Sequence, residues 1–250
     1  MKTEKDRIAP HPVLPAYYGD EEGRRQRVDD MFDSSAKHYD WIVNVMSFGS
    51  GTHYRRTALL RAGLAPGMKV LDVGAGTGVV SLPAQKIVGD DGLVVAVDPS
   101  KGMLSEATKL GVKHAVMGLG EKLPIEDNVF DFVTMGYALR HVDDLTMLFT
   151  EYRRVLKPGG KILVLEISRP GSALGLAALK FYMKKIVPAV TRIARRSSEA
   201  EELMRYYWDT IEQCVPPETI LAAMDEANVD KSERLVTMGI FSEYRGCKPE

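Results

Sequence analysis

Short apolar runs alternate with amphipathic stretches through the middle of the chain, and this alternation predicts strands and helices in turn. The apolar runs predict strands over 69–73, 93–98, 112–117, 130–136 and 161–167. The stretches between them predict helices over 79–89, 101–111 and about 143–156. Apolar runs of this kind are typical of parallel strands covered on both faces, with right-handed crossovers. The pattern therefore predicts an α/β fold with a doubly wound sheet.

The two ends of the chain have different patterns. Residues 1–20 contain prolines and few periodic apolar positions, which predicts a loosely ordered tail, whereas residues 21–62 predict a helical cap. Residues 172–226 are again helical in pattern, and Gly239 then separates two short strand-like runs. Strands joined by so tight a turn are antiparallel. We expect a tail and helical cap over 1–62 and one compact domain over 63–250.

The composition narrows the functional classes. The chain has 250 residues, a formal net charge of −1 and 45% hydrophobic residues, which is typical of a globular protein and unlike a primary nucleic-acid binder. Its two cysteines lack the paired spacing of metal ligands. The sequence has neither a secretory signal pattern nor an apolar run long enough to span a bilayer. We therefore expect a cytoplasmic protein with no metal site and no nucleic-acid partner.

The motif "VLDVGAGTG", residues 70–78, carries the strongest chemical signal. Three glycines follow a predicted strand and precede a predicted helix, so a ligand can approach the backbone closely. Asp98 ends the next predicted strand, 20 residues after Gly78 (98 − 78 = 20). A carboxylate at this place accepts hydrogen bonds from ribose hydroxyls. The combination favours a cofactor that contains a nucleoside over an empty tight turn.

The spacing within the motif bears on which cofactor binds. Gly74, Gly76 and Gly78 lack the final spacing that leads a pyrophosphate onto a helix N-terminus. Asp72, at the end of the strand, would repel a pyrophosphate and attract an ammonium group. S-adenosylmethionine has a ribose and an amino-acid tail but no phosphate, so it fits both features. The alternatives are that Asp72 caps the helix or holds the loop, and that the cofactor is a nicotinamide dinucleotide.

With these residues, the chain resembles class I S-adenosylmethionine-dependent methyltransferases, and more narrowly the C-methyltransferases of ubiquinone and menaquinone biosynthesis. The resemblance covers about residues 37–247. Its segments are "YDWIVNVMSFG", "VLDVGAGTG", "VDPSKGML", "EKLPIEDNVFDFVTMGYALRHVDD", "RVLKPGGKILVLEISRP", "YYWDTIEQCVPPETILAAM" and "FSEYRG". The glycine motif and "LKPGG" occur in many methyltransferases, whereas "ALRHV" and "LEISRP" are more specific to this family.

The resemblance implies a Rossmann-like sheet of seven strands whose last strand is inserted antiparallel. Thr77 and the glycines would line the methionine end of S-adenosylmethionine, Asp98 would hold the ribose, and Met103 would lie against the adenine. For Met103, packing in a helix core is an equal alternative. The implied cofactor-binding residues are Asp72, Gly74, Gly76, Thr77, Gly78, Asp98, Pro99, Met103, Leu119, Gly120 and Gly136.

The chain departs from the family pattern at several positions. Leu119 stands where the family usually has an Asp or Asn that pairs with the adenine amino group, so backbone groups would have to recognise adenine. Gly136 stands in place of a usual serine, and His141 in place of a usual asparagine. Because several departures lie in signatures that face the substrate in the family, a divergent substrate is one expectation. The other departures are Val43, Gly51 and Glu212.

Methylation of a ring carbon needs a group that removes or stabilises the proton of a neighbouring hydroxyl, because the phenolate feeds electrons into the ring. His141, with an ordinary pKa of about 6.5, is the candidate base, and Arg140 is the candidate cation beside the phenolate. By resemblance, Tyr39 would close over the cofactor and substrate. The structural alternatives are that His141 caps a helix, that Arg140 pairs with Asp143 or Asp144, and that Tyr39 is a core aromatic.

Residues 173–196 combine apolar positions with basic ones. A basic amphipathic helix can lie on an anionic membrane surface, which would suit a polyprenyl substrate. A solvated helix beside the core or at a homodimer interface explains the pattern nearly as well, and Pro188 is expected to kink the helix. The basic residues are Lys180, Lys184, Lys185, Arg192, Arg195 and Arg196.

Together these features predict a cytoplasmic S-adenosylmethionine-dependent methyltransferase that methylates an aromatic, quinol-like ring carbon, with peripheral contact to the inner face of the membrane as a further expectation. One rival is a methyltransferase of the same fold that acts on another small molecule at oxygen, nitrogen or sulfur. A second rival is a non-catalytic scaffold that binds S-adenosylmethionine, which the loss of a side-chain contact at Leu119 would favour.

Overall fold

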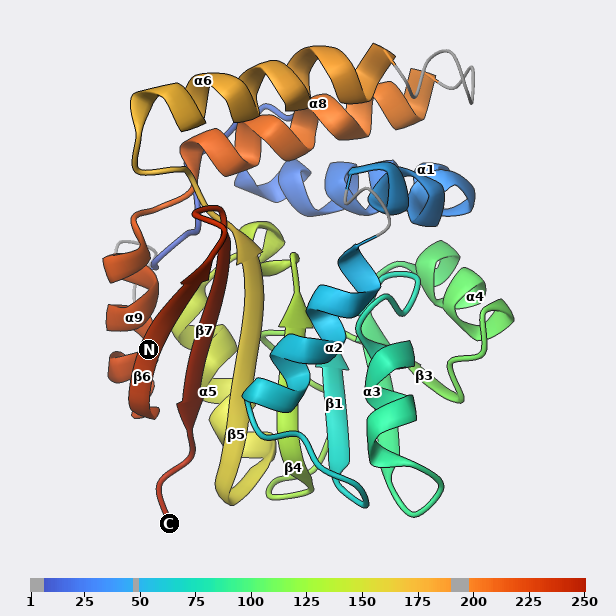
Figure 1. Ribbon diagram of the computed structural model, residues 1–250, viewed down its shortest axis with the longest axis vertical. Helices are drawn as coiled ribbons and strands as arrows, with labels where there is room; N and C mark the ends of the chain where they lie inside the picture. Colours follow the sequence, from blue (N-terminus) through green and yellow to red (C-terminus); the bar gives the residue numbers. More distant parts are fainter. Residues whose placement is uncertain (1–6, 47–49, 190–197) are drawn as a thin grey trace.

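The structure is a computed structural model that describes residues 7–46, 50–189 and 198–250. Within these ranges, the sheet has seven strands in the order β3-β2-β1-β4-β5-β7-β6 (Figure 1). β1 to β5 pair in parallel, and β7 lies antiparallel between β5 and β6. The predicted doubly wound sheet with an inserted antiparallel strand is confirmed. The strands are β1 (Lys69–Val73), β2 (Leu93–Asp98), β3 (His114–Met117), β4 (Phe130–Gly136), β5 (Leu156–Ile167), β6 (Asp230–Thr237) and β7 (Phe241–Cys247).

β5 begins earlier than the sequence predicts, at Leu156 rather than at residue 161. Its register against β4 shifts between Phe130 and Phe132, as in a β-bulge. The Gly159 N–H donates a hydrogen bond to the carbonyl of Lys248 at 3.1 Å. The glycine-rich segment therefore bends, with Gly159 at a φ of +73°, while its backbone stays paired with the end of the chain.

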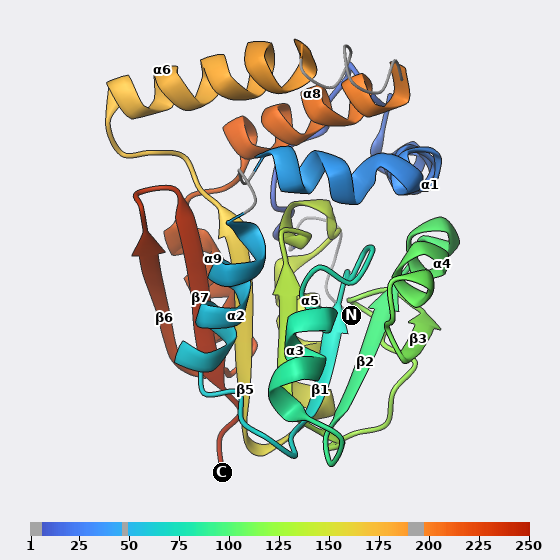
Figure 2. The same ribbon diagram turned by 45° about the vertical axis from the view of Figure 1, so that its right-hand side comes forward.

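Helices cover both faces of the sheet. One face carries α2 (Gly51–Arg61), α3 (Ser81–Val88) and α4 (Lys101–Lys109), and the other carries α5 (Leu145–Val155) and α9 (Pro217–Glu226) (Figures 1 and 2). Successive side chains of a strand point to opposite faces, so the near-continuous apolar runs fill both layers. The first layer contains Val70, Val94, Ala96 and Leu163. The second layer contains Leu71, Val97, Val133 and Val164.

Side-chain caps fix the starts of two helices near the carboxyl edge of the sheet. The Ser100 hydroxyl accepts a hydrogen bond from the Met103 N–H at 3.0 Å, at the start of α4. The Asp144 carboxylate accepts hydrogen bonds from the N–H groups of Thr146 at 2.8 Å and Met147 at 3.2 Å, at the start of α5. Such caps satisfy N–H groups that the first helical turn leaves unpaired. Ser100 comes two residues after β2, and Asp144 ends the loop that follows β4, so each cap holds a loop at this edge.

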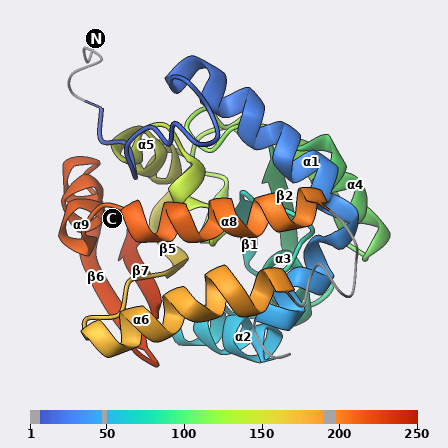
Figure 3. The same ribbon diagram turned by 90° about the horizontal axis from the view of Figure 1, so that it is seen from above.

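A layer of helices lies above the carboxyl ends of the parallel strands. It consists of α1 (Glu21–Met46), α6 (Ala173–Phe181), η3 (Tyr182–Ile186) and α8 (Ser198–Gln213), with α6 farthest from the sheet (Figures 1 and 3). The buried side chains that hold these helices together include Met31, Tyr39, Met183, Leu203 and Trp208. The cap is thus built from two distant segments of the chain, of which the sequence predicts only the first as a cap.

The described part of the N-terminal tail packs against the rest of the molecule, contrary to the loose tail that the sequence predicts. Leu14 is buried in the core of the cap. The Val215 N–H donates to the carbonyl of Pro10 at 2.8 Å. The Tyr17 hydroxyl donates to Asp209 at 2.7 Å, across 192 positions of sequence. The sequence does not predict this packing, because its prolines are typical of loops. The carbonyl of a proline can still accept a hydrogen bond, as Pro10 does here.

Part of the basic stretch lies outside the described residues, namely Arg192, Arg195 and Arg196, as does the side chain of Val43. Within the described part of the stretch, the π-helical turns of η3 come just before Pro188, where the ring interrupts regular helical bonding. Over the ranges that the structure describes, no helix is both long enough and apolar enough to cross a membrane.

Candidate cofactor and active site

The glycine motif forms the turn between β1 and α3. Gly74, Gly76 and Gly78 have φ angles of +63°, +55° and +87°, a region that other residues rarely adopt. A Cβ atom on Gly74 would lie 2.6 Å from the Ala138 side chain, and one on Gly78 would lie 2.5 Å from Val112. A Cβ atom on Gly76 would meet no atom closer than 3.9 Å. Two of the glycines are therefore required by internal packing, and Gly76 marks the open side of the turn.

Asp98 joins this turn to the end of β2. Its carboxylate oxygens accept hydrogen bonds from the Gly76 N–H and the Ser100 N–H, each at 2.8 Å. Burial raises the pKa of Asp98 to about 6, and the negative charges of Asp29 and Asp33 contribute to the rise. Asp33 reaches this strand end from α1, where it accepts a hydrogen bond from the Ser100 hydroxyl. The glycine turn and β2 therefore meet at Asp98, and α1 joins them through Ser100, which donates to both Asp98 and Asp33.

Asp72 is fully buried at the end of β1. One of its oxygens accepts a hydrogen bond from the Ser81 hydroxyl at 2.6 Å, which holds the start of α3. The other oxygen, Oδ1, has no hydrogen-bond partner among the described residues. Burial raises the pKa of Asp72 to about 7. Asp72 thus holds the loop, as the structural alternative predicts, and its second oxygen is buried without a partner among the described residues.

A cavity lies between the strand ends and α1. Five predicted site residues line it: Gly74, Pro99, Leu119, Gly120 and His141. The predicted residues that do not line it are Tyr39, Asp72, Gly76, Thr77, Gly78, Asp98, Met103, Gly136 and Arg140. The remaining lining residues are Arg24, Arg25, Val28, Asp29, Val73, Glu121, Met135, Ala138 and Val142.

Several predicted cofactor residues have packing roles in this structure. Met103 is 1% exposed and belongs to the core of the cap, which is the alternative that the sequence left open. A Cβ atom on Gly136 would lie 2.5 Å from Val80, and one on Gly120 would lie 2.7 Å from Leu148. A serine at position 136 would therefore collide with Val80. Thr77, also predicted, is completely buried within the turn.

His141 ends the short helical turn η2 (Leu139–His141) after β4. Its Nδ1 lies 3.1 Å from the hydroxyl of Tyr206, whose ring stacks on the imidazole at a centroid distance of 5.4 Å. Its Nε2 is buried and has no hydrogen-bond partner among the described residues. Burial, together with the positive charge of Arg140, holds the pKa of His141 well below its ordinary value of 6.5. The imidazole is therefore neutral at neutral pH and keeps one nitrogen for a ligand.

Arg140 is completely buried beneath the cap. Its Nε lies 3.1 Å from the carboxylate of Glu166 on β5. Its Nη1 donates hydrogen bonds to the Thr210 hydroxyl at 2.6 Å and to the Tyr207 carbonyl at 3.2 Å, both on α8. These contacts tie η2 to the sheet and to the cap. In this structure Arg140 positions the neighbouring His141 and has no contact with the cavity.

The structural alternatives for this pair of residues are wrong. Asp143 forms its ion pair with Arg25 of α1 rather than with Arg140. Asp144 caps α5, so His141 does not cap that helix. The sequence could not distinguish these partners, because Arg140 pairs with a carboxylate on a different strand.

Tyr39 reaches from α1 over the glycine turn, where its ring edge lies nearest the open side of Gly76. Its hydroxyl is 2.7 Å from the hydroxyl of Tyr207, and its ring lies 6.2 Å from that of Phe32. Within such a pair only one hydroxyl can donate to the other, so one phenol proton is left for a further acceptor. Tyr39 is therefore a core aromatic that also covers the turn.

The charged residues of α1 that line the cavity are absent from the sequence predictions. Arg24 is 1% exposed, and its Nη2 donates to the carbonyl of Val142 at 3.1 Å. Arg24, Val28 and their neighbours Arg25 and Asp29 share one side of the helix, because their spacing of three to five residues matches its period. This stripe was visible in the sequence. That it faces the strand ends was not.

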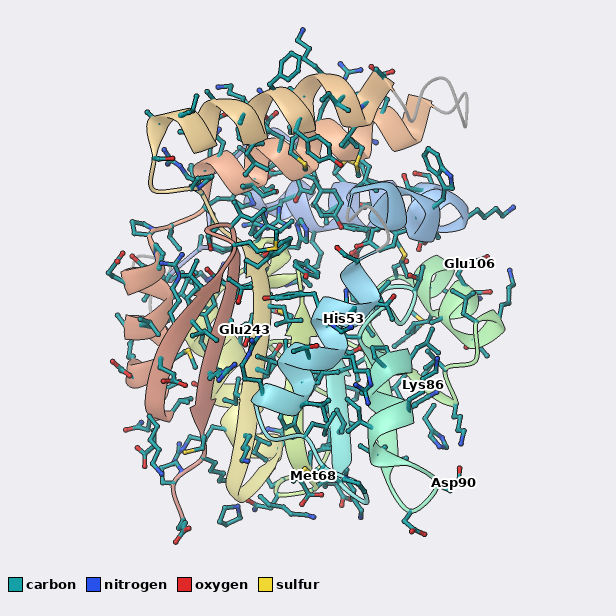
Figure 4. The ribbon with its side chains drawn as sticks, in the orientation of Figure 1. His53, Met68, Lys86, Asp90, Glu106 and Glu243 are labelled. Atoms are coloured by element: carbon teal, nitrogen blue, oxygen red, sulfur yellow. The ribbon has the colours of Figure 1, made fainter. Side chains whose placement is uncertain are left out.

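A second buried charged cluster lies away from the cavity. Glu243 on β7 is fully buried and accepts hydrogen bonds from Arg61 of α2 and from Arg245 (Figure 4). The hydroxyl of Tyr54 also donates to Glu243, at 3.3 Å. Because each oxygen of this carboxylate has a partner, the cluster joins α2 to the sheet and does not form a second site.

Comparison with known proteins identifies the family. The model of the ubiE/COQ5 methyltransferase family matches residues 21–248. The chain belongs to this family. The ubiquinone/menaquinone biosynthesis C-methyltransferase UbiE of Shewanella frigidimarina is 35% identical over 229 residues, which cover 88% of this chain and 90% of that protein. The protein of the same name from Idiomarina loihiensis is 32% identical over 233 residues, covering 90% of this chain and 92% of that protein.

Solved structures with lower identity share the fold. A methyltransferase from Thermotoga maritima has a TM-score of 0.62 at 22% identity and covers 88% of this chain and 98% of its own. Phosphoethanolamine N-methyltransferase 2 of Haemonchus contortus, solved with S-adenosyl-L-methionine, has a TM-score of 0.62 at 17% identity, covering 87% of this chain and 57% of its own. The chain is an S-adenosylmethionine-dependent methyltransferase, as the sequence predicts. The open turn at Gly76 and the unpaired oxygen of Asp72 fit this cofactor.

Proposed function

We propose that this methyltransferase transfers a methyl group to a ring carbon of a quinol-type substrate, as in ubiquinone or menaquinone biosynthesis. The observation that carries the proposal is the match to proteins named for such C-methylation over about nine-tenths of both chains. The neutral His141 beside the cavity supports it, because ring-carbon methylation needs a group that handles a hydroxyl proton.

In the proposed arrangement, the cofactor lies along the carboxyl ends of β1 and β2. Asp98 would accept hydrogen bonds from the ribose hydroxyls, and the unpaired oxygen of Asp72 would face the ammonium group. The glycine turn would receive the methionine end. The adenine would lie against Pro99 and Leu119, which line the cavity after β2 and β3. S-adenosylmethionine supplies a methyl group on a sulfonium, which is the electrophile.

The proposed role of His141 is to take the proton of a substrate hydroxyl on Nε2. The ring oxygen then becomes anionic, and the neighbouring carbon becomes nucleophilic enough to accept the methyl group. Tyr206 holds the other imidazole nitrogen, and Arg140 holds the turn on which His141 lies. The positive charge of Arg24 in the same cavity favours the anionic oxygen. Transfer leaves S-adenosylhomocysteine, and the methylated ring carbon then releases its own proton to solvent, which restores the aromatic ring. The ring oxygen takes its proton back from His141, which returns to the neutral form.

Methyl incorporation tests this proposal. Purified protein is incubated with methyl-labelled S-adenosylmethionine and either demethylmenaquinol or a demethylated benzoquinol. We expect label in a product whose new methyl group is bound to carbon, as identified by mass spectrometry. Turnover of neither quinol would contradict the proposal. Oxygen, nitrogen or sulfur methylation of a molecule from cell extract would favour the first rival, and cofactor binding without any product would favour a scaffold.

We also propose that α6 lies on the surface of an anionic membrane, which would give the protein access to a polyprenyl substrate. Two large apolar side chains of α6 are exposed, Leu174 by 83% and Phe181 by 61%, and so is Ile186 of the adjoining η3, by 42%. No residue of α6 is buried, and Lys185 is also exposed. Apolar side chains beside a cation suit the interface of an anionic bilayer. The ion pair of Lys180 with Glu212 reduces the available charge, so the contribution is chiefly apolar.

Cosedimentation with phosphatidylglycerol vesicles tests the membrane contact. We expect binding by the wild type and loss of binding by the variant Leu174→Glu/Phe181→Glu. Light scattering of both proteins tests the alternative that α6 forms a homodimer interface. In that case the wild type would be a dimer that does not bind vesicles, and the same variant would be a monomer.

A further inference from the structure

Asp29 places a carboxylate in the same cavity as the residues proposed to contact the adenine. It lies on α1, one turn after Arg25, and lines the cavity together with Pro99, Leu119 and Gly120. Two of these residues follow β3, and Pro99 follows β2. Asp29 is therefore the acidic group that the cap presents to this part of the cavity.

Asp29 differs from the other charged residues of the cavity in having no partner. Arg25 forms an ion pair with Asp143, and Arg24 donates to the backbone carbonyl of Val142. Glu121 accepts a hydrogen bond from the Asp143 N–H at 2.6 Å. Asp29 makes no hydrogen bond or ion pair with another described residue, and it is partly buried. Partial burial raises the pKa of Asp29, while the positive charge of Arg25 opposes the rise and the negative charge of Asp33 adds to it.

Electrostatics place Asp29 close to the carboxylate proposed to hold the ribose. Its charge contributes to the raised pKa of Asp98, so the two carboxylates lie within interaction range. The nucleobase is attached to the ribose, and its exocyclic amine is a hydrogen-bond donor that needs an acceptor when it is buried. Leu119, which also lines the cavity, has an apolar side chain that cannot accept that bond. Asp29 is thus an unpaired carboxylate that lines the cavity together with Pro99 and Leu119.

We propose that Asp29 accepts a hydrogen bond from the amino group of the cofactor's adenine and so determines the specificity of the enzyme for that base. This inference rests on the proposed placement of the cofactor along β1 and β2. It implies that adenine is recognised by the cap, whereas the ribose is recognised by the sheet. Cofactor binding would then hold α1 against the strand ends.

Calorimetric titration with two ligands tests the proposal. The first is S-adenosylhomocysteine, and the second is its analogue with purine in place of adenine, which lacks only the amino group. Hydrogen bonds to a charged acceptor are among the stronger ones, so we expect the wild type to bind the purine analogue about tenfold more weakly. Asp29→Ala should bind S-adenosylhomocysteine about tenfold more weakly than the wild type does, and should bind both ligands equally.

Asp30→Ala is the matched control, because Asp30 is the exposed neighbour on the same helix. It should retain the full discrimination between the two ligands. Equal binding of both ligands by the wild type would overturn the proposal. This measurement needs no variant, so the proposal can be tested even if Asp29→Ala fails to fold. Discrimination that persists in Asp29→Ala but disappears in Glu121→Gln would also overturn it, in favour of Glu121. Failure of the wild type to bind S-adenosylhomocysteine at all would instead overturn the cofactor placement.

Discussion

The strand ends and the helical cap meet at one cavity, yet the sequence encodes these two regions differently. At the strand ends, Gly74 and Gly78 are fixed by their positive φ angles and by close neighbours, and Asp98 is fixed by its hydrogen bond from the glycine turn. In the cap, α1 and α8 come from opposite ends of the chain and are held together by packing. The strand ends could therefore be identified from a short motif, whereas the cap is defined only by the folded molecule.

The strand ends and the cap also differ in the groups that they contribute to the cavity. In the proposed arrangement, the carboxylates of the strand ends bind groups that every S-adenosylmethionine molecule carries. The cap supplies Tyr206 beside His141, and the charged face of α1. We infer that the strand ends set the cofactor and the cap sets its orientation and the choice of acceptor.

The largest effect is expected from Arg140→Met, which leaves Glu166 buried without its cation. Removing one partner of a buried ion pair costs about 3–5 kcal/mol of unfolding free energy. Chemical denaturation followed by circular dichroism measures this loss. The double variant Arg140→Met/Glu166→Gln should recover part of it, because no uncompensated charge remains. A loss below about 1 kcal/mol for the single variant would show that this pair does not hold the cap on the sheet.

The next effect concerns chemistry. His141→Gln should lower kcat about 100-fold with a quinol substrate, because general bases typically contribute at least that much. His53→Gln is the control, since His53 is exposed on α2 (Figure 4) and should leave kcat unchanged. Because the pKa of His141 lies well below 6.5, wild-type kcat should show no loss as the pH falls through 6.5. A kcat of His141→Gln equal to that of the wild type would exclude His141 as the base.

Gly78→Ala tests the backbone requirement at the strand ends. The positive φ and the collision with Val112 should together cost about 2 kcal/mol of unfolding free energy. Gly67→Ala is the matched control, because Gly67 also has a positive φ but its Cβ would meet nothing within 4 Å. That control should lose only about 1 kcal/mol. An equal loss of unfolding free energy in the two variants would mean that close packing against Val112 is not the reason for a glycine at position 78.

The smallest effect is a pH dependence of cofactor binding. Burial raises the pKa of Asp72 to about 7, so below this pH the folded protein holds a proton that must leave before the carboxylate can pair with an ammonium group. The affinity for S-adenosylhomocysteine should therefore fall about tenfold as the pH is lowered from about 8 to about 6. Calorimetry should show a much weaker dependence for Asp72→Asn. An equal pH dependence of the affinity in both proteins would show that Asp72 does not pair with the ammonium group.

The sequence predicts the strand ends well and the cap poorly. The order of strands and helices, the turn at Gly76 and the position of Asp98 follow from local periodicity and from one motif. Met103 and Arg140 illustrate what could not be predicted. Met103 has helical spacing whether it faces a ligand or the cap, and Arg140 finds its carboxylate on β5 only through tertiary structure. Asp29 belongs to an ordinary charged stripe until α1 is placed over the strand ends.

The long separation between Tyr17 and Asp209, 192 positions apart, has a consequence for the order of assembly. Contacts between distant segments contribute only after the chain between them is closed, so they form late in folding. The helical cap would accordingly dock after the sheet is complete, and it would undock while the sheet stays folded. Ligand exchange could then proceed through a partially undocked intermediate whose strands remain protected from hydrogen exchange.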